Sequence, residues 1–403
     1  MNGPLNILLI ARHFGEVGSG GARRPMLLAQ SLRALGHFVT IVSPFVGAAE
    51  DEIRVELELD RQGPHDSNVY SPRHVELRAE RPESGLLALP RRILPARLMK
   101  MARAVRYFPD IEIIWARQVI KRLQSESRHF DWVITTSPPE SLHRVGRPIA
   151  DHFGARWMAD LRDSWIDDNH RDNVQGLRRM IEFWVSRRWL GRADLLCAVD
   201  RFIQDELRRI VGDNIPIVQI GHFSEKSETP PAILPSDTYN LVHSGAFELS
   251  HTMRSIGEVV KSLSAIQLER NPDHLPLHLH IAGRLSEAEI AVCDSSNLMI
   301  TRHGPVGLTR SRALQSGADG LFLYCPLGSR ALPGKIAEYA LSGRPIFYMG
   351  PESILELMVD PSLARPLNRL VSASKSDVGP IDSSYQARNA AAQLIKAMHE
   401  VQD

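Results

Sequence analysis

A lysine and a glutamate lie close together in the segment PGKIAEY, residues 333–339. If a helix begins near Gly334, its first turn directs N–H groups and the positive end of the helix dipole toward the preceding loop. A diphosphate would suit such a site, and Lys335 would add a positive charge to it. The spacing alone equally permits a plainer arrangement, in which Glu338 caps the helix and Lys335 points into solvent.

A second group of candidates lies elsewhere in the same half of the chain. Gly245 comes directly after the apolar segment 240–244, and a glycine there would let phosphate oxygens approach the backbone closely. The nearest cations are Arg254 and Arg284, which are candidates for neutralising a diphosphate, although either could be an exposed arginine. Together with the segment 333–339, these residues form the predicted donor-binding set of the second half.

Charged residues also follow an apolar segment in the first half, in the sequence DLRD. Asp160 or Asp163 could orient or deprotonate a hydroxyl group, and Arg162 lies between them. The same carboxylates could instead cap the following helix or pair with Arg162. His13 and Ser137 also stand near predicted strand ends. We therefore take Asp160 and Asp163 as catalytic candidates, and His13, Ser137 and Arg162 as acceptor-binding candidates.

The loop at residues 12–21 is rich in glycine, which permits unusual backbone angles and close approach to a ligand. Its spacing does not fit the G-x-G-x-x-G pattern, and no acidic residue ends the second predicted strand. A dinucleotide oxidoreductase is therefore disfavoured. The loop could also be a flexible turn without a ligand. Its glycines are Gly15, Gly18 and the two donor-binding candidates Gly20 and Gly21.

Apolar runs of strand length alternate with segments of helical spacing along the chain. This alternation is typical of parallel sheets flanked by helices, in which ligands bind where the strands end. The predicted strands are 6–11, 38–43, 132–136, 157–160, 193–199, 216–220, 240–244, 277–282, 299–302, 320–325 and 345–349. The predicted helices are 25–35, 91–108, 114–128, 141–153, 175–190, 201–210, 252–268, 286–293, 307–315, 334–341 and 384–401.

A polar segment with three prolines, residues 221–238, separates two sets of strands and predicts a linker. We therefore expect an α/β protein of two Rossmann-like domains, whose parallel sheets face a cleft between them. The N-terminal domain would span residues 1–225 and the C-terminal domain residues 236–383. A last amphipathic helix, within residues 384–403, would pack back on the N-terminal domain.

Composition narrows the classes of protein that fit. A length of 403 residues, with 43% hydrophobic and 24% charged residues, predicts two globular domains. Three cysteines without CxxC spacing argue against a disulfide framework or a structural zinc site, and predict a reducing, cytoplasmic location. No secretory signal or membrane-spanning run is apparent. A net charge of +1 gives no indication of nucleic-acid binding.

Residues 91–128 are conspicuously basic, and apolar residues are interleaved with the basic ones. A basic amphipathic segment suits an anionic membrane surface, so it predicts peripheral contact with the inner face of the cell membrane. The alternative is a solvated helix face that packs on the N-terminal domain. No nucleic-acid-binding motif accompanies the basic residues.

Several segments, taken in order, resemble the family 4 retaining glycosyltransferases, which have the GT-B architecture. They are the strand, glycine loop and helix of residues 6–44, the SPP and DLRD turns within 131–165, residues 193–210, and the segment ADGLFLYCPLGSRALPGKIAEYALSGRPIF at 318–347.

The resemblance implies transfer of a hexose or N-acetylhexosamine, with retention, from a nucleoside diphosphate bound by the C-terminal domain to a glycan bound by the N-terminal domain. We expect the acceptor to be lipid-linked, in the synthesis of bacterial surface polysaccharide or glycoconjugate. The resemblance also implies that Lys335 contacts the diphosphate, as a catalytic residue, and that Glu338 accepts hydrogen bonds from the ribose. No cofactor and no obligatory metal would be needed.

The sequence departs from the family in three places. Arg330 stands where many members have a glutamate that contacts the sugar, so the transferred sugar cannot be inferred. An arginine and a lysine that often follow the first strand of the second domain are missing around Gly245, and a histidine found in many relatives is missing near Asp160. Two other functions therefore remain open: a nucleotide-sugar 2-epimerase and a non-catalytic glycosyltransferase-like subunit.

Overall fold

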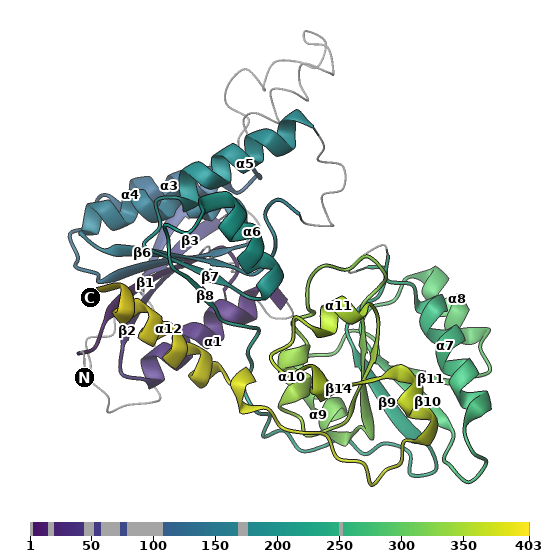
Figure 1. The fold of residues 1–403 in the computed structure, drawn as a ribbon. Coiled ribbons are helices and arrows are strands. Elements are labelled where there is room, and N and C mark those ends of the chain that lie inside the picture. Colours follow the sequence, from purple (N-terminus) through teal and green to yellow (C-terminus); the bar gives the residue numbers. More distant parts are fainter. Residues whose placement is uncertain are drawn as a thin grey trace. The chain divides into compact units, whose positions relative to one another are not determined.

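The computed structural model describes residues 3–14, 20–43, 52–57, 73–78, 108–167, 176–249 and 253–402. The chain divides into two compact units. Unit 1 consists of residues 1–220 and 391–403, and unit 2 consists of residues 221–390. Each unit contains a six-stranded sheet with helices on both faces (Figure 1).

The sheet of unit 1 is parallel, with the strand order β2-β1-β5-β6-β7-β8. Its strands are almost continuously apolar, because helices cover both faces and leave few positions for polar side chains. The strands are β1 (Asn6–Ala11), β2 (Phe38–Val42), β5 (Trp132–Ser137), β6 (Arg156–Leu161), β7 (Leu195–Ala198) and β8 (Ile217–Gln219). A separate antiparallel pair comprises β3 (Glu52–Leu57) and β4 (Arg73–Arg78).

Helices lie on both sides of this sheet. Figure 1 shows α3 (Ile113–Leu123), α4 (His143–Phe153) and α5 (Leu177–Leu190) together on one side. The hydrophobic core on that side also includes residues of α6 (Arg201–Val211). Figure 1 shows α1 (Gly20–Ala34) and the last helix, α12 (Ala387–Gln402), on the other side.

The sheet of unit 2 is also parallel, with the order β11-β10-β9-β12-β13-β14. One core packs the sheet against α7 and α8, and a second packs its opposite face against α9, α10 and α11. The strands are β9 (Tyr239–Ser244), β10 (Leu277–Ala282), β11 (Met299–Arg302), β12 (Gly320–Tyr324), β13 (Ile346–Met349) and β14 (Ala364–Pro366). The helices are α7 (Ile256–Glu269), α8 (Glu287–Asp294), α9 (Leu308–Gly317), α10 (Ile336–Ala340) and α11 (Glu352–Leu355).

The predicted α/β class with two parallel sheets is confirmed, and several element boundaries differ. The helix expected at 141–153 begins as a 3₁₀ turn over Glu140–Leu142 before α4. The helix expected at 252–268 begins only at Ile256. Strand β14 was not predicted, because its three residues are too few to show a pattern. Of the helix expected at 91–108, residues 91–107 lie outside the described residues.

The segment expected to be a linker, residues 221–238, is bonded to the body of unit 2 instead. Ser224 accepts a backbone hydrogen bond from Ala387 and donates one to Tyr385. Further along, the N–H of Ala232 donates to the carbonyl of Ala313 at 2.8 Å. Its prolines and polar residues were therefore a poor guide, because a chain without periodicity can still be fixed through its backbone.

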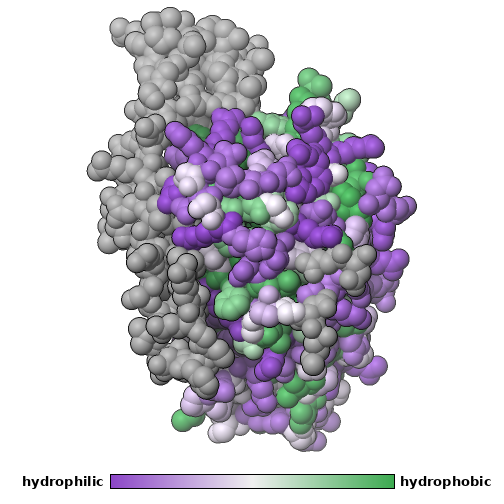
Figure 2. Space-filling model, turned by 90° about the vertical axis from the view of Figure 1, so that its left-hand side faces the viewer, coloured by the Kyte–Doolittle hydropathy of each residue, from purple (hydrophilic) through white to green (hydrophobic). Residues whose placement is uncertain are grey.

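On the face drawn in Figure 2, hydrophilic residues predominate and hydrophobic residues form separate patches. Within the described ranges, no helix combines the length and apolarity that a membrane span requires.

Gly146 lies in α4 against the indole of Trp157, which is fully buried. A Cβ atom on Gly146 would lie 1.9 Å from Cε2 of that ring. The ring itself is held in place, because its Nε1 donates a hydrogen bond to Thr135 Oγ1 at 2.9 Å. Glycine at this position therefore lets the helix pack closely on the sheet.

We expect Gly146→Ala to destabilise unit 1 by about 1–3 kcal/mol or more, as overpacking does in a filled core. Thermal and urea unfolding would measure the change. Gly257→Ala is the control, because Gly257 also lies in a helix but its Cβ would be 3.4 Å from Ser255 Oγ, an ordinary contact distance. Equal stability of the two variants would contradict the packing argument.

Candidate functional site

Lys335 and Gly245 meet at the edge of the unit 2 sheet. Gly245 follows β9 directly and has φ +128°, a conformation that favours glycine. A Cβ atom on Gly245 would lie 2.0 Å from Lys335 Nζ and 2.6 Å from its Cε. The lysine side chain thus occupies the space that any larger residue at position 245 would need. The structure brings together two candidates that are far apart in the sequence.

This meeting point is where the strand order of unit 2 reverses. From β9 the chain first proceeds to β10 and β11, and β12 then pairs with the opposite edge of β9. The loops after β9 and β12 therefore leave the sheet in opposite directions and open a crevice, the usual ligand position in open parallel sheets. Gly245 follows β9, and Cys325, which is close enough to affect the pKa of Lys335, follows β12.

A second glycine, Gly283 directly after β10, allows that strand end to lie close to Gly245. A Cβ on Gly283 would lie 2.1 Å from the carbonyl oxygen of Gly245, and the N–H of Gly245 donates to Ala282 at 2.7 Å. The loops after β9 and β10 thus pack backbone against backbone. Arg284 follows Gly283 and is exposed, and no contact places it beside Lys335.

The electrostatics of Lys335 are unusual for a surface loop. Burial lowers its pKa to about 7, and the positive charge of Arg254 lowers it further, whereas Cys325 opposes the shift. Among the described residues, no carboxylate oxygen lies within 4.0 Å of Lys335 Nζ. Two cations therefore share a partly buried site without a paired acid at the lysine, which is an arrangement that an anion would stabilise.

Glu338 is held on the same side of the sheet by a network of neutral side chains. Gln315, from α9, donates from its Nε2 to Glu338 Oε2 at 3.0 Å, to Ser244 Oγ at 3.1 Å and to Ser311 Oγ at 3.2 Å. Tyr339 adds to it, because its hydroxyl accepts a hydrogen bond from the N–H of Ser244 at 3.0 Å. The hydrogen bond from Gln315 thus orients the Glu338 carboxylate.

Sequence reasoning missed Gln315 and Ser244, although a signal was present. Ser311 and Gln315 are four residues apart in a helix and therefore share a face. Gln315 is only 3% exposed, and a buried amide requires hydrogen-bonding partners.

The expected helix N-terminus requires a correction. Helix α10 begins at Ile336, two residues later than predicted, and Lys335 occupies its N-cap position. The N–H groups of Ile336, Ala337 and Glu338 donate to carbonyls three residues earlier, at 3.0 to 3.3 Å. These N–H groups are therefore already hydrogen-bonded within a tight turn and are not available to a ligand. The attraction for an anion therefore rests on the Lys335 and Arg254 side chains.

The loop that precedes Lys335 is fixed by a residue from the supposed linker. His222 Nε2 lies 3.1 Å from the carbonyl oxygen of Leu332, and a Cβ on Gly334 would lie 3.5 Å from His222 Nδ1. Gly334 thus lies beside the imidazole ring, close to the Lys335 turn. Arg330, in the same loop, is exposed.

In unit 1, Asp160 lies at the end of β6 in a buried ion pair. Its Oδ1 accepts from Arg24 Nη2 at 2.9 Å, and its Oδ2 accepts from Arg24 Nε at 3.2 Å and from Thr136 Oγ1 at 2.8 Å. Burial alone would raise the pKa of Asp160, but the Arg24 charge and these hydrogen bonds lower it. We therefore correct the expected role of Asp160: its oxygens are engaged, and it joins α1 to the sheet.

Arg162 and Ser137 also form part of the framework. Arg162 Nε donates to the carbonyl of Ser137 at 2.8 Å, and its two Nη atoms donate to the carbonyls of Gly21 and Pro138. Because Arg162 and Ser137 are buried, this network fixes the ends of β5 and β6 against the start of α1. Neither side chain faces solvent as a binding residue for a glycan would.

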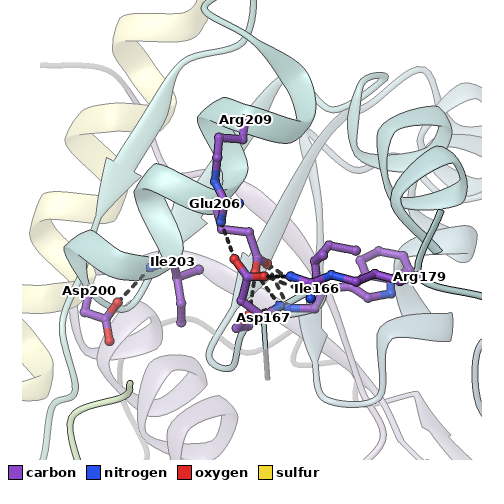
Figure 3. Close-up of polar contacts among 9 residues, drawn as sticks. Ile166, Asp167, Arg179, Asp200, Ile203, Glu206 and Arg209 are labelled. Atoms are coloured by element: carbon purple, nitrogen blue, oxygen red, sulfur yellow. Dashed lines mark hydrogen bonds and ion pairs between the residues drawn. The ribbon is translucent and has the colours of Figure 1, made fainter. Parts of the chain in front are cut away.

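The loop after β6 is shaped by Glu206, a buried residue of α6 (Figure 3). Its carboxylate accepts hydrogen bonds from the N–H groups of Trp165 and Asp167, each at 2.9 Å, and from the hydroxyl of Ser164. Asp167 lies between Arg179 and Arg209 and pairs with both. The acidic residues here therefore organise the loop.

Few of the acceptor candidates remain accessible. Asp163 is exposed in this loop, and His13 is half-buried after β1. Gly20 and Gly21 form the start of α1, and the carbonyl of Gly21 is engaged by Arg162. Gly15 and Gly18 lie outside the described residues. In the described part of the chain, no group of three or more His, Cys, Asp or Glu could hold a metal ion, so a metal-independent reaction stays an expectation.

We expect Asp160→Asn to destabilise unit 1 by about 3 kcal/mol, because Arg24 would then be buried without a counter-charge. Differential scanning calorimetry would measure the change. Asp163→Asn is the matched control: it removes the same charge three residues later from an exposed position, and we expect it to change stability by about 0.5 kcal/mol or less. Equal melting temperatures for the two variants would show that the ion pair is not structural.

Comparison with known proteins identifies the family and the fold. A profile of the glycosyl transferase 4-like domain matches residues 19–221, which is just over half of the chain. A sequence search of curated proteins finds no match.

Three solved structures are similar over nearly the whole chain. Sucrose-phosphate synthase from Thermosynechococcus elongatus has a TM-score of 0.56 at 16% identity, with 98% of each chain covered. The catalytic domain of starch synthase IV from Arabidopsis thaliana, bound to ADP and acarbose, has 0.56 at 10%, with 99% of each chain covered. The pneumococcal O-GlcNAc transferase GtfA, in complex with UDP and GlcNAc, has 0.55 at 11%, with 100% of each chain covered.

At these identities the similarity establishes the fold, and it confirms the predicted GT-B architecture of two Rossmann-like parallel sheets. The family match supplies the chemical class, which is glycosyl transfer. The chain therefore belongs to the glycosyl transferase 4-like family and is a GT-B glycosyltransferase.

Proposed function

We propose that this glycosyltransferase takes its sugar from a nucleoside diphosphate sugar bound by unit 2. The observation that carries the proposal is the position of the Lys335 ammonium group. It lies against Gly245, and it is close enough to Arg254 for that positive charge to lower its pKa. A nucleotide sugar carries a diphosphate that would neutralise these cations. The structures with bound UDP and ADP support a nucleoside diphosphate as the class of donor, without naming the base.

Within this site, we assign Lys335 and Arg254 to the diphosphate and Glu338 to the ribose hydroxyls. The hydrogen bond from Gln315 fixes the Glu338 carboxylate, which suits a group that must accept hydrogen bonds in a defined direction. Gly245 and Gly283 keep side chains away from the strand ends, so a phosphate could approach the backbone. Within unit 2, Arg284 stays a weaker donor candidate, since no contact joins it to Lys335. Gly20 and Gly21 of unit 1 stay donor candidates of this proposal.

The chemistry we propose is mainly electrostatic. As the bond from the sugar to the diphosphate breaks, negative charge develops on the leaving oxygen, and fixed cations stabilise that charge most when water is excluded. Lys335 and Arg254 would supply the positive charge that a metal ion provides in other enzymes. The proton of the acceptor hydroxyl would pass to a donor phosphate oxygen or to Asp163, the accessible carboxylate of the DLRD turn. Retention at the anomeric carbon stays part of this proposal.

For the acceptor we propose a lipid-linked glycan bound by unit 1, in the synthesis of bacterial surface polysaccharide or glycoconjugate at the inner face of the cell membrane. The described part of the basic segment supports this choice, because Arg117 and Lys121 are exposed on α3. The remainder of that segment, residues 91–107, lies outside the described residues.

A panel of nucleotide sugars, tested for thermal stabilisation of the full chain, addresses the donor directly. We expect at least one member to raise the melting temperature, and Gly245→Ala to abolish the shift, because its Cβ would displace the Lys335 side chain. Gly307→Ala is the control, since its Cβ would meet nothing within 4 Å.

The same panel separates the competing functions when lipid extract is added. Release of nucleoside diphosphate that depends on the extract supports transfer to a lipid-linked acceptor. Interconversion of the sugar without an acceptor would indicate an epimerase. If no nucleotide sugar binds, and Lys335→Ala with Glu338→Ala leaves the cellular glycan unchanged, the donor-site proposal is wrong and a non-catalytic subunit is favoured.

The pKa of Lys335, lowered to about 7, makes donor binding sensitive to pH. Above pH 7 the free protein loses the charge and must take up a proton on binding, so we expect affinity to fall by up to about tenfold for each pH unit. Isothermal titration calorimetry with a nucleotide sugar, from pH 6 to pH 9, measures this change. The diphosphate of a nucleotide sugar does not titrate in this range.

Lys335→Met should bind more weakly at pH 6 and show a flat profile, whereas Lys261→Met, an exposed lysine of α7, should retain the wild-type slope. A wild-type profile that is flat and as weak as that of Lys335→Met would mean that Lys335 does not bind the donor anion.

A further inference from the structure

A basic and aromatic pocket lies between α4 and α5 of unit 1. It has a volume of about 300 Å³. The side chains that characterise it are four arginines and two tryptophans: Arg144, Arg147, Arg188, Arg192, Trp184 and Trp189. It is lined entirely by residues outside the DLRD loop and outside the basic segment 91–128, so neither the transfer chemistry nor that segment accounts for it.

The arginines of the pocket differ in how their charge is balanced. Arg147 pairs with Asp151 at 2.8 Å and with Asp194 at 3.0 Å. Arg192 is 3.4 Å from Asp151. Arg144 and Arg188 have no carboxylate within 4.0 Å among the described residues, and Arg188 lies over the Trp184 ring instead, 5.6 Å from its centroid. The pocket thus keeps an excess of positive charge.

A buried histidine in the wall of the pocket points to an absent ligand as well. His143 lines the pocket and is 1% exposed. Its Nδ1 lies 2.9 Å from Thr135 Oγ1, but its Nε2 is buried and has no hydrogen-bond partner among the described residues. An unsatisfied polar atom of this kind is costly, so it needs a reason.

Helix α5, which forms one wall, has an unusual distribution of residues. Leu177, Met180, Ile181 and Trp184 are 71%, 70%, 43% and 61% exposed, and their spacing places them on one stripe of the helix. The fully buried positions of the same helix are Glu182, Ser186 and Leu190, on the opposite side. Two of these three are polar. Phe183, Val185 and Trp189 also pack against the core, so α5 is apolar on its inner side and again on this outer stripe, unlike a helix whose outer side simply faces water.

The charges around the stripe indicate which kind of partner would cover it. Helix α5 contains four arginines, at positions 178, 179, 187 and 188, and a single acid, Glu182, which is buried and paired with Arg178. A second copy of the chain facing the stripe would bring arginines against arginines. An anionic lipid surface would instead meet both features, because apolar and tryptophan side chains enter the boundary of the acyl chains while arginines bind phosphates.

We propose that the outer stripe of α5 and the adjoining pocket form a docking surface for an anionic phospholipid bilayer, with one lipid phosphate in the pocket. Trp184 belongs to both the stripe and the pocket, so the two make one continuous surface. The pocket offers Arg144 and Arg188 to the phosphate, and the stripe offers Leu177, Met180 and Ile181 to the acyl chains. This surface is independent of the donor site and of the identity of the acceptor.

Co-sedimentation of the full chain with vesicles tests the proposal without any substrate. We expect binding to phosphatidylcholine vesicles that contain 30% phosphatidylglycerol, at least about tenfold stronger than binding to pure phosphatidylcholine, and weaker binding at higher salt. Tryptophan fluorescence of the wild-type protein should be quenched by phospholipids brominated in their acyl chains. This quenching requires no variant, and its absence would overturn the proposal.

Two variants separate the stripe from the pocket. Met180→Ser with Trp184→Ser should lower the vesicle partition coefficient by at least about tenfold, since it removes two exposed apolar side chains that would enter the lipid. Arg144→Ala with Arg188→Ala should remove the preference for phosphatidylglycerol. Lys261→Ala with Lys396→Ala is the charge-matched control, and we expect it to bind as the wild type does, because both lysines are exposed and neither belongs to α5 or lines the pocket.

Besides the absence of quenching, three results would overturn the proposal. One is equal binding of wild type and stripe variant. A second is binding that shows no preference for the anionic lipid. The third is a dimer in analytical ultracentrifugation that Trp184→Ser dissociates, which would make a second copy of the chain the partner.

Discussion

The Lys335 side chain occupies the space beside Gly245, at the point where the strand order of the unit 2 sheet reverses. The lysine can turn inward only because position 245 carries no side chain, and the backbone angle there favours glycine as well. The parallel sheet makes this meeting possible, since it brings the loops after β9 and β12 to the same edge. Burial then makes the charge on Lys335 costly, and the nearby Arg254 adds to that cost. Binding of an anion would neutralise these charges and lower the free energy of the site. A diphosphate is such an anion.

At the equivalent sheet edge of unit 1, the charged side chains are instead paired within the protein. Asp160 is paired with Arg24, and Arg162 donates hydrogen bonds to backbone carbonyl groups. Glu206 accepts hydrogen bonds from the N–H groups of the loop after β6. These groups satisfy each other and make a rigid edge. If the proposed function holds, the contrast has a chemical reason, because an acceptor hydroxyl group is uncharged, whereas a nucleotide-sugar donor brings two phosphates. A rigid edge can orient a hydroxyl without attracting an anion.

Strands could be predicted from the sequence because burial on both faces leaves a local mark, a continuous apolar run. Lys335 and Glu338 could be selected because their residue types suit the chemistry. The partners of the candidate residues, Asp160 included, could not be predicted. Arg24 looks like an ordinary helix arginine, and its pairing with Asp160 spans 136 residues. His222 likewise acts through a contact with Leu332, 110 residues away, that no local pattern encodes. The start of α10 was misplaced because a tight turn absorbs the N–H groups that a longer helix would leave unpaired.

The return of the chain to unit 1 through α12 has a consequence for how the protein is made. The first 220 residues leave unit 1 without its last segment, residues 391–403, which follows the whole of unit 2 in the sequence. During synthesis from the N-terminus, unit 2 must therefore emerge from the ribosome before unit 1 can be completed. The Arg156 guanidinium donates to the carbonyl of Val401, a residue that is synthesised only after the whole of unit 2. Unit 1 is the first to begin folding and the last to finish, and a chain cut within unit 2 would leave both units incomplete.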